Sequence, residues 1–163
     1  MDVAALQSIF TTLPVDVVAV VLFATAATVL TLRMGASISI AFSLALIIAT
    51  VLFDALPDTF MLGQVLAGIA SPFVATAIYL GLVLVLTFVF YRMSATLSDD
   101  SARPLFAIAA GAATSAVVLT VWHLAPPLQT LWSFNPAIQA AFGASYRLYW
   151  LFLAFVAFAF VKS

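Results

Sequence analysis

The stretch that decides the fold reads PFVATAIYLGLVLVLTFVFY at residues 72–91, RMSATLSDDSAR at 92–103 and PLFAIAAGAATSAVVLTVWHL at 104–124. A helix rises about 1.5 Å per residue, so roughly 20 apolar residues cross the hydrocarbon core of a bilayer. The first and third segments are that long and apolar, and the middle segment is polar. The stretch therefore predicts two membrane-spanning helices joined by a loop outside the membrane.

The composition of the whole chain indicates an integral membrane protein. Of the 163 residues, 66% are hydrophobic and 7% are charged, whereas a soluble domain carries about 25% charged residues. Because so few residues are charged, we expect a lipid bilayer as partner. The formal net charge of −1 provides no basic field to attract nucleic acid, so we expect none to bind. With no cysteine and a single histidine, we expect no disulfide, no metal site and no cofactor.

The apolar runs predict an all-α polytopic fold of about five spans in a single transmembrane domain. We expect these spans at about residues 14–32, 36–53, 72–91, 104–124 and 146–161. The break at Arg33-Met34-Gly35 makes the first two spans a helical hairpin. The second span is short, and if it is re-entrant instead, four full spans remain.

Two shorter segments are predicted to lie in the membrane interface. Residues 59–70 are amphipathic and too short to span; they form either a separate helix or a continuation of the third span through a kink at Pro72. Residues 136–142 follow Asn135, a good N-cap residue, and precede Gly143, a common helix terminator.

The charged residues predict the orientation. Five spans place four basic residues on one side, namely Arg33, Arg92, Arg103 and Lys162. The other side receives Asp2, Asp16, Asp54 and Asp58, together with Arg147. Because basic residues favour the cytoplasmic side, we expect the N-terminus outside and the C-terminus in the cytoplasm.

Small residues recur at helical spacing in the first and fourth predicted spans. They are Ala24, Ala27 and Thr28 in the first, and Ala107, Gly111 and Ser115 in the fourth. Such faces let helices approach closely in lipid, either within one chain or between chains. An assembly partner would be a copy of the chain or another membrane protein.

Four polar side chains are candidates for a cluster at the outer face: Asp54, Asp58, His123 and Arg147. Arg147 either pairs with one of the two aspartates or binds lipid phosphate. His123 is either a polar anchor at the interface or a group for acid–base chemistry. Because the middle of every span lacks ionisable residues and no hydrolase or nucleotide-binding motif occurs, we predict no catalytic residue and no enzyme.

Two functions are compatible with these patterns. The first is a non-enzymatic membrane subunit or scaffold that uses its small-residue faces for assembly. The second is a small pore, channel, transporter or holin-like protein. Its path would be lined by hydroxyl side chains of the first two spans: Thr25, Thr28, Thr31, Ser37, Ser39 and Ser43.

The layout of residues 15–124 resembles the colicin V production protein (CvpA) family. The matching features are Asp16 at the first span, Arg33-Met34-Gly35, the long span Pro72–Tyr91, Asp100 with Arg103, and the small-residue run Ala107–Ala116. The resemblance implies a bacterial inner-membrane protein with a non-enzymatic role in colicin V export and envelope maintenance. The family does not account for the uncharged link and the phenylalanine-rich span that follow Leu124.

Overall fold

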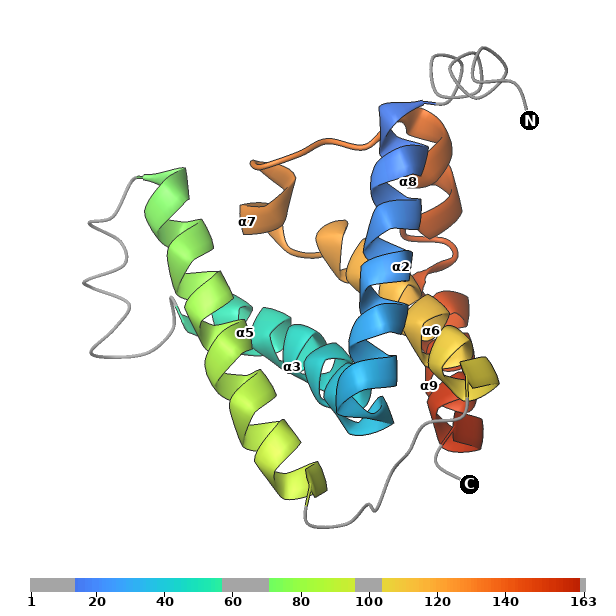
Figure 1. Ribbon diagram of the computed structural model, residues 1–163. Helices are drawn as coiled ribbons and strands as arrows, with labels where there is room; N and C mark the ends of the chain where they lie inside the picture. The colour runs from blue at the N-terminus through green and yellow to red at the C-terminus, as the bar shows by residue number, and fades with distance from the viewer. Residues whose placement is uncertain (1–13, 57–70, 96–103, 162–163) are drawn as a thin grey trace, which may run out of the picture.

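The computed structural model describes residues 14–56, 71–95 and 104–161, and these residues form helices and no strand. In chain order the helices are α2 (Val15–Met34), α3 (Ala36–Ala55), α5 (Pro72–Ala95), α6 (Pro104–Trp122), α7 (Pro126–Gln129), α8 (Pro136–Phe142) and α9 (Arg147–Val161) (Figure 1). The predicted all-α fold is confirmed. The predicted helix at 59–70 and the residues Asp2, Asp58, Asp100, Arg103 and Lys162 lie outside the described residues.

Four helices, α2, α3, α5 and α6, are long and apolar enough to cross a membrane. The 20 residues of α3 extend about 30 Å, which suffices for a full crossing. The last predicted span, 146–161, is observed as α9, whose 15 residues extend about 22 Å, less than the thickness of the hydrocarbon core. It qualifies as a fifth span only together with α8, from which it is bent by 67°.

Two of the long helices form the centre of the molecule. In the membrane-spanning part of α3, 50% of the residues are buried, and in that of α6, 56% are buried. The corresponding share is 17% in each of α2 and α5. α3 packs against α2, α5 and α6, and α6 also packs against α2 and α9. The outer helices α2, α5 and α9 therefore expose most of their apolar side chains to the surroundings, as membrane helices do.

α2 and α6 approach each other closely at Gly111. A Cβ atom built on Gly111 would lie 2.8 Å from the Cα of Thr28 and would also overlap its Oγ1. Ala107 and Ser115, one turn to either side of Gly111, are buried as well. The small-residue faces expected to serve assembly or internal packing thus pack against each other within one chain at this point.

Hydroxyl groups inside the bundle are paired with one another or with backbone carbonyls. Thr31 bonds Ser39 between α2 and α3, Ser43 bonds Thr114 at 3.5 Å, and Thr50 bonds Tyr79 at 3.1 Å. No buried side-chain nitrogen or oxygen among the described residues lacks a partner. These pairs tie α3 to each of its three neighbours, because an unpaired polar group is costly in an apolar interior.

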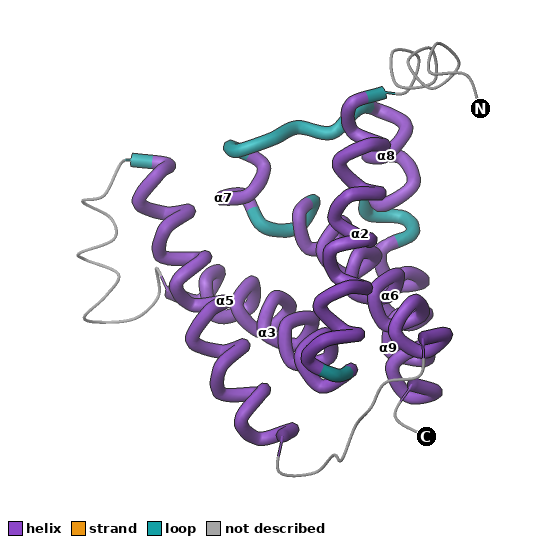
Figure 2. Tube along the Cα trace, in the orientation of Figure 1, coloured by secondary structure: helices purple, strands orange, loops and turns teal. Residues whose placement is uncertain are grey.

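The described loops gather at one end of the molecule. Figure 2 shows them around α7 and α8, near the start of α2. The turn between α2 and α3 lies at the other end of the molecule. That turn is the single residue Gly35, whose φ of 84° suits glycine, and its N–H donates to the carbonyl of Thr31 at 2.9 Å. The predicted hairpin break therefore holds, and the longer connection from α6 to α9 shapes the opposite end.

We expect Gly111→Ala to destabilise the fold by about 2 kcal/mol, because the added methyl group forces α2 away from α6. Unfolding by SDS in mixed micelles measures this change. Gly81→Ala is the matched control, since a Cβ there meets no atom within 4 Å. Equal stability of the two variants would contradict the described contact.

Candidate functional site

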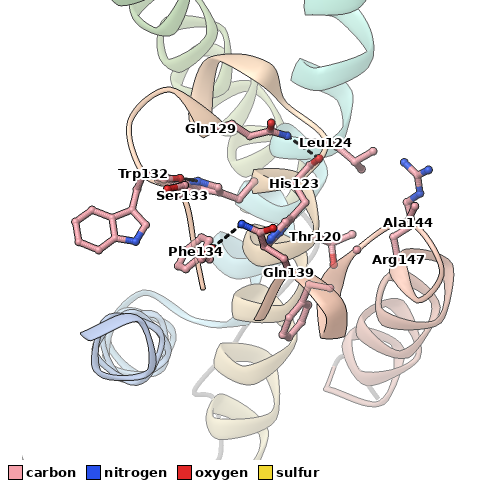
Figure 3. Close-up of a pocket in the computed structure, with 13 residues that line it drawn as sticks. Thr120, His123, Leu124, Gln129, Trp132, Ser133, Phe134, Gln139, Ala144 and Arg147 are labelled. Carbon is pink, nitrogen blue, oxygen red and sulfur yellow. Dashed lines mark hydrogen bonds between the residues drawn. The ribbon is translucent and has the colours of Figure 1, made fainter. Parts of the chain in front are cut away.

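A pocket of about 570 Å³ opens at the end of the bundle that carries the long connection (Figure 3). The end of α6 forms its floor, and the loop to α8 together with the start of α9 forms its walls. Its polar lining includes Thr120, His123, Gln129, Ser133, Gln139 and Arg147. In Figure 3, Trp132 and Arg147 lie on opposite sides, with His123 and Gln139 between them.

The structure brings together two of the four residues expected in the outer polar cluster. His123 and Arg147 both line the pocket. Asp54 does not; it lies exposed in the last turn of α3, a helix that packs against α2, α5 and α6. The expected Arg147–Asp54 pair is therefore not formed. Asp58 lies outside the described residues, so an Arg147–Asp58 pair stays a prediction.

Asp16 anchors the loop that forms one wall of the pocket. The Trp132 indole Nε1–H donates to Oδ1 of Asp16 at 3.0 Å, and the Asn135 backbone N–H donates to Oδ2 at 2.7 Å. Only 9% of the Asp16 surface is exposed. A carboxylate in the first turn of a helix also meets the positive end of the helix dipole. The first turn of α2 therefore fixes a loop more than a hundred residues later in the chain.

Further hydrogen bonds hold the loop in one shape. Trp122 Nε1–H donates to the carbonyl of Trp132 at 2.9 Å, and the Gln139 amide donates to the carbonyl of Phe134 at 2.6 Å. The Gln129 amide donates to the carbonyl of His123 at 2.8 Å. These side chains pair with the loop carbonyls and so fix the path of the backbone.

His123 is held from two sides. Its Nδ1 lies 2.7 Å from the carbonyl of Leu119, and because a carbonyl only accepts, Nδ1 carries the hydrogen. The ring stacks on Phe134 with 5.8 Å between centroids. This arrangement leaves Nε2 as the acceptor nitrogen of the neutral ring.

A corner between α8 and α9 places Arg147. The Asn135 side chain caps α8 by accepting from the N–H of Ile138 at 3.0 Å, so the predicted helix at 136–142 is confirmed. Trp150 donates to the carbonyl of Ala141 at 2.8 Å across the corner. A Cβ on Gly143 would lie 2.5 Å from the carbonyl oxygen of Gln139, so the corner requires glycine.

One charged side chain distinguishes the lining of this pocket. Arg147 supplies a positive charge to the described lining, and its guanidinium makes no hydrogen bond or ion pair to a described residue. The arrangement therefore favours an anionic or polar group.

Sequence reasoning missed most of this site. Asp16 was named only among the acidic residues of the outer side and the features shared with the CvpA family, and Gln129, Trp132, Phe134 and Gln139 were not singled out. The available signal was a link without charges, between two apolar runs, that contains tryptophan, glutamine and asparagine. Such residues are unexpected near lipid unless their polar groups have partners.

No family model, no curated protein and no solved structure matches the chain. The resemblance to the CvpA family therefore stays a prediction. The functional conclusions below depend on the geometry of the chain itself.

We expect Asp16→Ala to release the loop, since Trp132 Nε1–H and Asn135 N–H lose their acceptor, at a cost of about 2 kcal/mol. Hydrogen exchange at the Asn135 amide should accelerate by at least tenfold. Thr25→Val is the control, because the Thr25 hydroxyl bonds only the carbonyl of Val21 on its own helix. Unchanged exchange in Asp16→Ala would show that the carboxylate does not hold the loop.

Proposed function

We propose that the chain is a non-enzymatic integral membrane subunit or scaffold that assembles through the outward face of α5. Its partner is a second copy of the chain or another membrane protein. The single observation behind this proposal is Gly81, a glycine on an exposed helix face where an added Cβ meets no atom of the described residues within 4 Å.

Gly81 contrasts with Gly111. A Cβ at position 81 meets nothing within 4 Å, whereas one at position 111 collides with α2. Glycine in a helix interior is less favourable than alanine by about 1 kcal/mol, so an exposed glycine without an internal contact calls for another explanation. Ala77, one turn earlier, is exposed too, and this small-residue face suits close approach by a helix of another chain.

The surroundings of Gly81 supply the rest of a helix-packing surface. Among the described helices, α5 packs against α3 and the short α7. Leu80, Leu84 and Val85 flank the glycine and are 44%, 70% and 62% exposed. Large apolar side chains beside a small-residue groove provide the van der Waals contact that drives association in lipid.

The charges of the described residues favour one orientation in the membrane. Arg33 and Arg92 lie in the last turns of α2 and α5, at the same end of the molecule (Figure 1). We propose that this end faces the cytoplasm of a bacterial inner membrane and that the pocket faces outward.

The hydroxyl pairs favour a scaffold over a pore. Of the side chains that would line a path, Thr31, Ser39 and Ser43 are buried and bonded to neighbouring helices. Thr25 and Thr28 bond carbonyls of their own helix. A water-filled path would require these groups to face a channel instead.

We expect Gly81→Leu to abolish assembly while leaving the fold intact, because the larger side chain fills the groove a partner helix would enter. Native mass spectrometry of protein extracted in mild detergent reports the composition of the particle. Ala112→Leu, on an exposed face of α6, is the matched control. A monomeric wild-type chain, or an unchanged particle in Gly81→Leu, would contradict the proposal.

We expect liposomes that contain the purified chain to retain an ion gradient as well as empty liposomes do, because the bundle interior is closed by hydroxyl pairs. Fluorescent potassium and proton indicators measure the leak. A leak that disappears in a Ser39→Leu, Ser43→Leu double variant would favour the pore instead.

A further inference from the structure

A second cavity adjoins the polar pocket. It has a volume of about 290 Å³ and is lined almost wholly by apolar atoms. Ala19 and Phe23 of α2 form one side, and Val118 and Leu119 of α6 form the other. We refer to this cavity as the apolar groove.

The apolar groove and the polar pocket share a wall. Trp122, Trp132 and Phe134 line both cavities. Tryptophan is enriched at the level of lipid head groups, where one side of the ring is apolar and the other is wet. A polar space and an apolar space on either side of one aromatic wall fit a ligand that is itself polar at one end and apolar at the other.

The charges in the polar pocket select an anionic head group. Arg147 lines the pocket with a guanidinium that has no partner among the described residues, and as the first residue of α9 it adds to the positive end of that helix. The Asp16 carboxylate already accepts hydrogen bonds from the Trp132 indole and the Asn135 backbone N–H. The amides of Gln129 and Gln139 are engaged with loop carbonyls and shape the pocket without adding charge.

We propose that this end of the molecule binds one anionic membrane phospholipid, with its phosphate at Arg147 in the polar pocket and one acyl chain in the apolar groove between α2 and α6. The site is independent of assembly through α5, which involves a different helix face. The groove accepts the tail of any lipid equally well, so it contributes to retention in detergent but not to the choice among lipids. Selectivity among lipids must come from the contact between Arg147 and the phosphate-bearing head group.

The test places the full chain in nanodiscs of equal phosphatidylglycerol and phosphatidylcholine. Lipid that stays bound after transfer to detergent is then identified by native mass spectrometry. We expect phosphatidylglycerol to be retained about fivefold over phosphatidylcholine, the ratio that one arginine near a head group provides. Equal retention of the two lipids would overturn the proposal.

Two pairs of variants test the two halves of the site. Arg147→Gln should abolish the preference, while Arg92→Gln, at the other end of the bundle, should keep it. Ala19→Phe should fill the apolar groove and abolish retention, while Val21→Phe, at an exposed position outside the groove, should keep it. Retention that survives Ala19→Phe, or a preference that survives Arg147→Gln, would overturn the proposed binding mode.

A competition experiment distinguishes a bound lipid from a bound soluble anion. Millimolar inorganic phosphate should leave phosphatidylglycerol bound, because free phosphate lacks the tail that occupies the groove. Displacement of the lipid by phosphate would assign the pocket to a soluble anion and overturn the proposal. The oligomeric state is read from the same spectra, so failure of assembly and failure of lipid binding are distinguished.

Discussion

The close contact between Gly111 and Thr28 is the constraint on which the rest of the structure depends. It brings α2 against α6, because no side chain larger than hydrogen fits between them at that point. In lipid there is little hydrophobic force to hold two apolar helices together, so such close approach and the van der Waals contact it permits decide which helices pair. With α2 fixed on α6, the hydroxyl pairs can tie α3 to both and to α5.

The same contact sets up the end of the molecule that carries the pockets. Between Gly111 and that end, residues of α2 and α6 line the two sides of the apolar groove. Asp16, in the first turn of α2, then lies where it can accept hydrogen bonds from Trp132 and Asn135. The two donors offset the cost of burying the Asp16 carboxylate. The same two hydrogen bonds fix the position of the loop.

Much of the fold could be predicted from the sequence, because long apolar runs leave few alternatives. The helices at 36–53, 104–124 and 136–142 were expected within two residues of their observed ends. The last helix was expected at 146–161 and is observed at 147–161, but its pairing with α8 as one bent span depends on the corner at Gly143 and could not be predicted. Asp16 could not be assigned to the loop, because its partners lie more than a hundred residues away and only tertiary packing brings them together.

The measurement that tests this account most directly asks whether the small-residue faces meet within one chain. The chain has no cysteine, so Ala24→Cys and Ser115→Cys introduce the only thiols, one turn from the Gly111 contact on helices that run in opposite directions (Figure 1). Oxidation in native membranes should give a bridge within single chains of monomer mass. Bridges that join two chains would contradict the account, because these faces would then serve assembly.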